Sequence, residues 1–390
     1  MANTKKRWTT EEIEILKKHY PTEGDAVFKR LPGRTAKSCR IQASKMKISK
    51  NISSAIIVKA LTCRDGYLYG IGNDSEGNVY KLYGGMNSNL SAVKISFSGA
   101  YNPIAITCDG TNVVWALGLP QYKSRFIGWQ AVNTFKSTAT DFIQSSITST
   151  VFGPTDICST IEDVAGYEPN IWISGKIGSN AAIWGANSTV LSGGGRYTNA
   201  NLPNSPFISC CSLVQYTQYS DKPYVFPVFI TENGDIASAT PIHSQSKDFK
   251  VTTRKYEKLN GAKMVRSLNG WLFIACRKSD GMYLYRVPKL SPIWKNDMSS
   301  AIKGLKIASE ELTILDMVYA GGVYIVAWKD GSGNVKVWQT TDPENDVGIY
   351  GLTVTLGSGF TAKAMATDGT SVCILADNGS AVQKAVAKIE

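Results

Sequence analysis

Few residues of this chain have the types and spacing that catalysis or metal binding requires. Its 390 residues include two histidines, His19 and His243, which excludes a site built from several histidine ligands. A Ser-His-Asp or Cys-His arrangement would depend on one of these two, and neither lies in a segment that resembles a catalytic elbow. The eight cysteines are scattered and form no C-x-x-C pair, so we interpret them as buried thiols.

Clustered acidic residues and glycines are expected in turns. Asp342, Glu344 and Asp346 alternate as in a calcium loop, but the twelfth position from Asp342 is Thr353, where an EF-hand needs a bidentate glutamate. The glycine run at residues 193–196 lacks the Lys-Ser/Thr pair of a phosphate-binding loop. We therefore expect no catalytic residues, no metal and no cofactor, and predict that the protein is not an enzyme.

Basic residues are concentrated at the N-terminus. Residues 1–50 hold 13 Lys and Arg against five Asp and Glu, a net charge of +8, whereas the other 340 residues contribute only +3. Concentrated positive charge is typical of a nucleic-acid-binding segment. The hydrophobic share of 43% excludes a largely disordered chain. We therefore divide the chain into a small basic domain, 1–50, and a large, nearly neutral domain, 51–390.

Three short helices are predicted in the small domain. Thr9 and Glu12 have the spacing of a capping box, which starts a first helix that Pro21 is expected to end. Thr35 caps the third helix, in which Ala36, Cys39, Ala43 and Met46 form one apolar stripe. The predicted helices cover 10–20, 25–31 and 36–47. Three helices with a tight turn before the third describe a helix-turn-helix.

The opposite face of the third helix is basic and polar. Lysine and arginine contact phosphates or guanine edges, serine can bond to base edges, and Ile41 could meet a thymine methyl group. The basic run at residues 4–7 would be an arm that follows a neighbouring groove. These features predict that the small domain binds duplex DNA.

The small domain resembles the Myb/SANT-like helix-turn-helix family. The matching residues are Trp8-Thr9-x-Glu11-Glu12, Leu16 and Leu31-Pro32-Gly33-Arg34-Thr35. The short variants in bacterial GcrA-type regulators and phage-encoded homing endonucleases are particularly similar. The chain departs from eukaryotic Myb repeats, which usually have three spaced tryptophans. Some SANT relatives bind proteins, usually through a more acidic third helix. By this resemblance, the DNA-facing positions would be Lys37, Arg40, Ile41, Ser44 and Lys45. Together with the basic arm and the turn before the third helix, the predicted DNA-binding residues are Lys5, Lys6, Arg7, Arg34, Lys37, Arg40, Ile41, Ser44 and Lys45.

The large domain repeats one local pattern, an apolar strand, a tight turn and a second apolar strand. The turns contain Gly66, Gly110, Gly270, Gly322 and Gly369, and weaker copies lie near residues 166–173 and 221–230. Asp-Gly and Asn-Gly supply the positive φ angles that tight hairpins need. The first and last turns are 303 residues apart, which gives about 50 residues per repeat over six intervals. A repeat of this length with several strands is typical of a β-propeller.

The fold class that we predict is mainly β, a propeller of about seven blades preceded by the helix-turn-helix. The blades are expected to begin near residues 57, 103, 155, 206, 262, 312 and 361. The last has room for three strands, so we expect a strand from about 51–57 to complete it and close the ring. Trp115, Trp172, Trp271 and Trp328 are expected to pack within the blades. The alternatives are two stacked β-sandwiches or a β-prism-like repeat. The resemblance to WD40, kelch and sialidase-like propellers is one of architecture only, without their sequence motifs.

Two functions remain open from the sequence. The first is a non-enzymatic, phage-encoded adaptor that binds duplex DNA and docks an unknown protein or glycan on the propeller. The second is a structural protein of a phage virion, such as a decoration, tail or receptor-binding component, in which the small domain is an anchor. A carbohydrate-binding or carbohydrate-active propeller is a weaker third hypothesis. No apolar run is long enough to span a membrane, and the N-terminal residues, charged from the fifth position, lack the apolar core of a signal peptide. We therefore expect the host cytoplasm or the virion.

Overall fold

The structure is a computed structural model, and its description leaves out some segments of the chain. It describes residues 7–389 except positions 47, 49, 53, 332, 334, 346 and 355 and segments 96–100, 119–125, 147–151, 161–169, 187–195, 199–201, 218–219, 242–248 and 289–298. Several residues considered above lie outside the described part, namely Lys5, Lys6, His243, Asp346 and the glycines at 193–195.

The small domain contains three helical segments, as the sequence predicts. They are the α-helix α1 (Thr10–Glu23), the 3₁₀ helix η1 (Gly24–Arg30) and the α-helix α2 (Ala36–Lys45). The prediction that Pro21 ends the first helix is wrong, because α1 continues to Glu23. A proline this close to the end removes only one backbone donor. The helix stops at Gly24, whose positive φ of 59° breaks the repeat and whose N–H donates to the Tyr20 carbonyl.

The core of the small domain is formed by residues from all three helical segments. Leu16 and Tyr20 of α1 and Val27 of η1 pack against Cys39 and Ala43, which belong to the predicted apolar stripe of α2. Both capping boxes are present, one at each α-helix N-terminus. The stripe therefore fixes which face of α2 points inward, and the basic face points to solvent.

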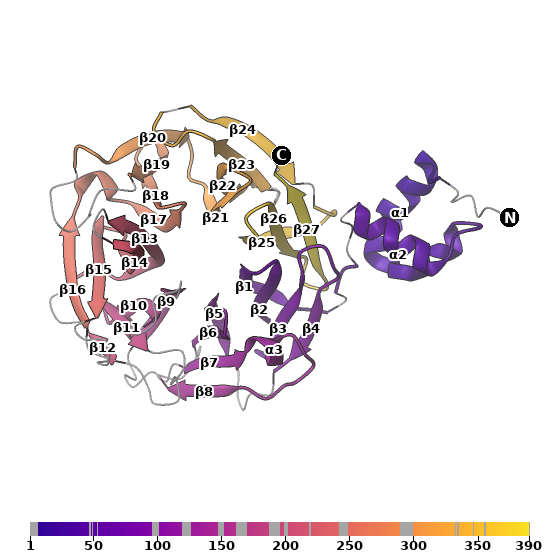
Figure 1. Cartoon of the computed structure of the whole chain (residues 1–390), viewed down its shortest axis with the longest axis horizontal. Coiled ribbons are helices and arrows are strands. Elements are labelled where there is room, and N and C mark those ends of the chain that lie inside the picture. Colours follow the sequence, from indigo (N-terminus) through magenta and orange to yellow (C-terminus); the bar gives the residue numbers. More distant parts are fainter. Residues whose placement is uncertain are drawn as a thin grey trace.

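The large domain is a ring of seven antiparallel sheets, each made of consecutive strands. We call the sheets blades 1 to 7 in chain order. Figure 1 shows the first strand of each blade nearest the centre and the last strands at the rim. Blade 1 is β1 (Ile57–Arg64), β2 (Tyr67–Asn73), β3 (Val79–Gly85) and β4 (Ser91–Lys94). Blade 2 is β5 (Asn102–Cys108), β6 (Asn112–Gly118), β7 (Phe126–Ala131) and β8 (Ile143–Ser146), with the short helix α3 (Val132–Phe135) between the last two.

The remaining blades follow the same order. Blade 3 is β9 (Phe152–Ser159), β10 (Ile171–Ile177), β11 (Asn180–Ala186) and β12 (Arg196–Thr198). Blade 4 is β13 (Phe207–Thr217), β14 (Ser220–Thr231), β15 (Asp235–Pro241) and β16 (Phe249–Lys255), followed by the 3₁₀ helix η3 (Glu257–Leu259). Blade 5 is β17 (Ala262–Leu268), β18 (Trp271–Lys278), β19 (Gly281–Val287) and β20 (Lys303–Ala308). Blade 6 is β21 (Thr313–Ala320), β22 (Val323–Lys329), β23 (Val335–Thr340) and β24 (Ile349–Val354). Blade 7 is β25 (Thr361–Thr367), β26 (Ser371–Asp377) and β27 (Val382–Lys388).

The predicted repeat is confirmed. The inner strands begin at residues 57, 102, 152, 207, 262, 313 and 361, each within three residues of its predicted start. All five turn glycines have positive φ, between 68° and 95°, and Asp65 and Asn269 share this conformation. Of the two weaker copies, 221–230 lies inside β14 and 166–169 lies outside the described residues. The ring excludes the stacked-sandwich and β-prism alternatives.

Ring closure also follows the prediction, through one residue pair instead of a full strand. Ile52 pairs with Val382 of β27 through two backbone hydrogen bonds, each 2.9 Å long. Lys384 of the same strand reaches blade 1, where its ammonium group donates to the carbonyls of Gly85 and Met86 at 3.1 and 3.0 Å. The chain segment before blade 1 thus joins the last blade to the first and removes an exposed sheet edge.

Every inner strand contains a one-residue β-bulge at the same place. The sheet register with the second strand skips one residue in each blade, namely Lys59, Ile104, Thr155, Ile208, Lys263, Leu315 and Lys363. A bulge bends the strand and increases its twist. The sequence pattern of apolar residues and turns did not reveal this feature.

Apolar clusters lie between neighbouring blades. There are seven, one at each blade boundary. Trp115, Trp172, Trp271 and Trp328 are at most 6% exposed, which confirms their predicted packing role. The cysteines are free thiols, buried except for the half-buried Cys63. Stability is therefore distributed around the ring.

Candidate functional site

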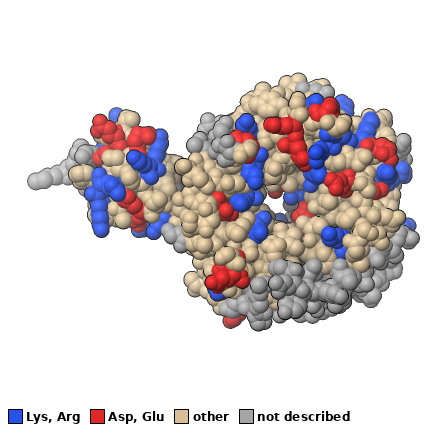
Figure 2. Space-filling view, turned by 180° about the vertical axis from the view of Figure 1, so that it is seen from behind, with Lys and Arg blue, Asp and Glu red and all other residues tan. Residues whose placement is uncertain are grey.

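The outer face of α2 carries most of the predicted DNA-binding residues. Lys37, Ile41, Ser44 and Lys45 are exposed, and Ile41 is 50% exposed although it is apolar. None of the residues of α2 is acidic. Figure 2 shows that basic side chains lie on the small domain alongside acidic ones. The face thus combines free ammonium groups, a hydroxyl and one apolar side chain. Ammonium groups of this kind can contact DNA phosphates, and the hydroxyl and the apolar side chain can contact the edge of a base.

Arg40 lies on the same face but has a partner within the domain. Its Nε donates to Asp25 Oδ2 at 2.8 Å, and the Arg40 side chain remains 64% exposed. The hydrogen bond from Arg40 holds the pKa of Asp25 below its usual value. Asp25 therefore orients Arg40 and neutralises part of its charge.

Arg34, another of the predicted DNA-binding residues, is paired within the small domain. Its side chain is 7% exposed and forms an ion pair with Glu12, with Nη2–Oε2 at 2.6 Å. The guanidinium lies 4.3 Å from the centre of the Trp8 ring and donates to the Arg7 carbonyl at 2.6 Å. Arg34 therefore links the N-terminal segment to the turn before α2 and does not present a free cation to DNA. Arg7 itself is exposed.

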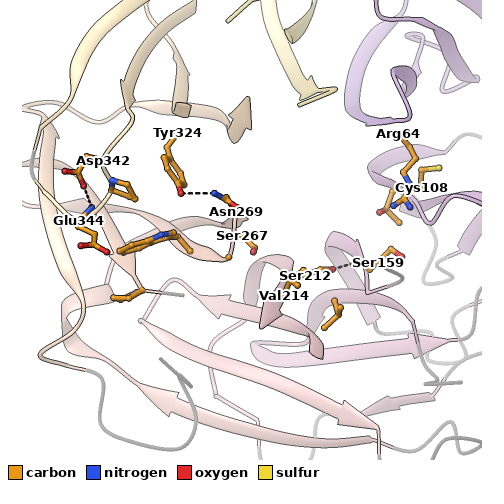
Figure 3. Close-up of a pocket in the computed structure, with 16 residues that line it drawn as sticks. Arg64, Cys108, Ser159, Ser212, Val214, Ser267, Asn269, Tyr324, Asp342 and Glu344 are labelled. Atoms are coloured by element: carbon orange, nitrogen blue, oxygen red, sulfur yellow. Dashed lines mark hydrogen bonds between the residues drawn. The ribbon is translucent and has the colours of Figure 1, made fainter. Parts of the chain in front are cut away.

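A wide funnel of about 930 Å³ lies at the end of the ring where the inner strands run into their hairpins. Residues from blades 1 to 6 line it, and Figure 3 shows Arg64 and Cys108 across the space from Asp342, Glu344 and Tyr324. The remaining lining residues are Thr107, Ser159, Ser212, Val214, Val225, Ser267, Asn269, Gly270, Trp271, Pro288 and Pro343. Positive and negative groups thus face each other across one opening.

The acidic side of the funnel is a preformed turn. Asp342 accepts hydrogen bonds from the Glu344 N–H at 2.9 Å and the Asn345 side-chain amide at 2.6 Å. The bond from Asn345 lowers the pKa of Asp342, so this carboxyl group is ionised at neutral pH. Within the described residues, no group of three or more His, Cys, Asp or Glu side chains could hold a metal ion. Asp342 acts as the cap of an acidic turn, the role that the sequence favours.

A smaller cavity of about 340 Å³ occupies the centre of the ring. Arg266 of blade 5 forms ion pairs there with Asp156 of blade 3 at 3.1 Å and Asp316 of blade 6 at 2.7 Å. Its guanidinium also donates to Ser209 Oγ of blade 4 at 3.0 Å. Burial raises the pKa of Asp316, whereas the two carboxylates outweigh the effect of burial on Arg266 and raise its pKa. One side chain therefore connects four blades electrostatically.

Comparison with known proteins identifies the architecture. No protein-family model matches the chain, and no curated protein matches it. A chain from the crystal structure of the mitotic checkpoint complex is similar over 87% of this chain and 94% of its own length, with a TM-score of 0.52 and 11% identity. The WD40 domain of Toxoplasma gondii coronin is similar over 87% and 82%, with a TM-score of 0.48 and 8% identity. The large domain is a seven-bladed β-propeller. At this identity the likeness shows the fold alone.

The Myb/SANT-like resemblance of the small domain stays a prediction, because no family model matches. The funnel of the propeller, with Arg64, Asn269 and Tyr324, was not among the sites predicted from the sequence. The only signal available was the position of these residues beside the repeated turns. No helix in the described part of the chain is long and apolar enough to cross a membrane.

Proposed function

We propose that the protein is a non-enzymatic adaptor, encoded by a phage, whose small domain binds duplex DNA through α2 and whose propeller docks another macromolecule. The observation that carries the DNA proposal is the exposed face of α2, where Lys37, Ile41, Ser44 and Lys45 are free of acidic neighbours on the same helix. Phosphate contacts from such lysines supply salt-dependent affinity.

The first test is DNA binding by the full-length protein, measured as a function of salt. Each phosphate contact that is lost reduces the slope of log affinity against log salt by about one. The double variant Lys37→Ala/Lys45→Ala is therefore expected to lower the slope by about two. The matched control is Lys17→Ala/Lys18→Ala, which removes an equal charge from α1, where both lysines are exposed and Lys17 already pairs with Glu14 at 2.9 Å.

The outcomes separate the hypotheses for the small domain. Loss of affinity in the α2 variant and near-normal affinity in the control support DNA binding through α2. Equal effects in both variants would indicate unspecific attraction of DNA to a basic domain. No binding even at low salt refutes the DNA proposal and favours the alternative in which the small domain is an anchor in a phage particle, which mass spectrometry of purified particles would test.

The docking role of the propeller is proposed from its shape and charge. The funnel is open, is lined by residues of six blades and carries separated charges of both signs. The described acids that line the funnel, Asp342 and Glu344, belong to one turn on one side of it, so a binding role fits better than hydrolysis of a carbohydrate between two opposed carboxyl groups. An array of glycans and glycosides tests the carbohydrate alternative directly.

A further inference from the structure

The funnel has a size and position suited to part of a larger ligand. Its volume of about 930 Å³ is at the upper end of the range for ligand pockets, and it opens directly to solvent. Six blades contribute to its lining, so no single blade forms a closed pocket. An extended segment that crosses the opening could touch opposite walls at the same time.

The charged groups of the funnel are available for such a ligand. Arg64, at the end of β1, is half-buried, and its guanidinium makes no ion pair with a described residue. On the other side, Glu344 is exposed, and its contact with Lys303 uses the backbone carbonyl, which leaves the carboxylate free. Asp342 adds a second, ionised carboxylate next to it. A complementary ligand therefore needs a negative and a positive group some distance apart.

Polar groups between the charged walls can recognise a peptide backbone. The Asn269 side-chain amide donates to the Tyr324 hydroxyl at 3.3 Å. This bond leaves the hydroxyl hydrogen of Tyr324 free to donate and the Asn269 carbonyl free to accept. One donor and one acceptor side by side match the C=O and N–H groups of an extended chain.

Other classes of ligand fit the funnel less well. The carboxylates of Asp342 and Glu344 repel a polyanion such as DNA, and they also disfavour an acidic glycan. A neutral glycan would leave Arg64 and Glu344 without an oppositely charged partner, although it could bond to Asn269 and Tyr324. A peptide uses both the charged walls and the polar groups between them.

We propose that the funnel binds an extended peptide segment of a protein partner, with an acidic side chain or C-terminal carboxylate at Arg64 and a basic side chain at Asp342 and Glu344. This inference rests on the proposed docking role of the propeller. It is independent of DNA binding by the small domain, so the failure of one does not imply the failure of the other.

The test is selection from a displayed library of random peptides on the immobilised full-length protein. We expect the enriched peptides to share one acidic and one basic residue at a constant separation. Arg64→Glu and Glu344→Lys should each weaken binding of the consensus peptide by at least about 10-fold, because each places like charges together. In addition, Arg64→Glu should bind the consensus peptide more tightly when the acidic residue of that peptide is replaced by lysine.

The control is Lys176→Glu, which makes the same charge change as Arg64→Glu but at the opposite end of the propeller. Lys176 is exposed and pairs in register with Gly153 near the start of β9, whereas the funnel lies at the end of that strand. This variant should bind the consensus peptide with unchanged affinity. Thermal unfolding of each variant checks that it is folded, and rescue by the charge-swapped peptide separates lost recognition from lost structure.

Three results would overturn the inference. The first is that no peptide is enriched. The second is that enriched peptides lack the charge pair or bind the two funnel variants as well as the unchanged protein. The third is that a neutral glycan binds and is lost in Arg64→Glu, which would assign the funnel to carbohydrate and leave the docking role itself intact.

Discussion

Replacing Arg266 by methionine should destabilise the propeller more than the loss of any surface ion pair. Arg266 Nε bonds to Asp316 at 2.7 Å, and its Nη1 bonds to Asp156 at 3.1 Å, Ser209 Oγ at 3.0 Å and the Cys210 carbonyl at 3.2 Å. Methionine fills similar space but carries no charge. The substitution leaves two carboxylates in the central cavity without their cation.

The magnitude follows from the burial of the three charges. Removal of one partner from a fully buried ion pair costs about 3–5 kcal/mol. The side chains of Arg266, Asp156 and Asp316 are 24%, 16% and 19% exposed, so water screens them in part, and we expect a loss of about 2–4 kcal/mol. The control is Lys263→Met on the same strand. Its pair with Glu232 is 34% and 54% exposed and should contribute less than about 1 kcal/mol.

The loss should also depend on pH, with a sign that the structure determines. Burial holds the pKa of Asp316 above its usual value of 3.8 in the folded protein, and Arg266 opposes this effect. Without Arg266 the folded-state pKa rises further above the unfolded value. A carboxyl group of this kind favours folding at low pH, and its contribution is lost as pH rises through the folded-state pKa. The variant should therefore be least destabilised near pH 4 and most destabilised at neutral pH.

The assay is urea unfolding followed by tryptophan fluorescence at pH 4.5 and 7.5, on the unchanged protein and both variants. A larger midpoint shift for Arg266→Met than for Lys263→Met, which grows with pH, is the expected result. The reasoning is refuted if the two variants lose equal stability at neutral pH. A loss for Arg266→Met that is the same at both pH values would refute the electrostatic explanation, because simple loss of packing does not titrate.

Three further predictions concern the joints of the propeller. Burial lowers the pKa of Lys81 to about 8, below its usual 10.5. The free energy of unfolding should therefore rise by about 3 kcal/mol between pH 8 and 10.5 in the unchanged protein, relative to Lys81→Met, which lacks this amine. Urea titration at both pH values measures the difference. Deletion of the first 55 residues removes the Ile52 bridge to Val382 and should lower the free energy of unfolding by about 1–3 kcal/mol more than deletion of the first 50. Urea unfolding midpoints measure this difference, and equal midpoints would exclude a role of the bridge in ring closure. Gly261→Ala should destabilise by more than about 2 kcal/mol, because φ is +83° and a Cβ would lie 1.9 Å from the Arg277 carbonyl oxygen; an unchanged melting temperature would contradict this.

Local patterns of the sequence were sufficient for most of the fold. The Asp-Gly and Asn-Gly turns require positive φ, and Gly66 and Gly369 adopt it as expected. The spacing of these turns, with two weaker copies of the pattern between them, predicted every blade start within three residues. The helix at Ala36–Lys45 was predicted from its cap and apolar stripe. Each of these features depends on residues that are close together in the chain, and their conformational preferences can be read directly.

Local patterns were not sufficient for the partners of charged side chains. Arg34 belongs to a predicted DNA-binding set, yet it pairs with Glu12, which lies 22 residues earlier in the chain. In the sequence, the bulge residues and the ends of the inner strands resemble ordinary strand positions. Nothing in these segments indicates that Arg64 and Glu344 lie on opposite sides of one funnel. Such contacts depend on how the blades close around one axis.

The division between the two kinds of information has a physical basis. Helix caps, tight turns and alternating apolar residues are governed by backbone geometry and burial over a few neighbours, so the sequence alone specifies the helices, the strands and the repeat. The pairing of Arg266 with Asp156 joins residues 110 positions apart, and Lys384 reaches a carbonyl 299 positions away. Burial sets the strength of such charge interactions, and burial exists only once seven blades have packed into a ring. The funnel and its opposed charges therefore arise from tertiary packing.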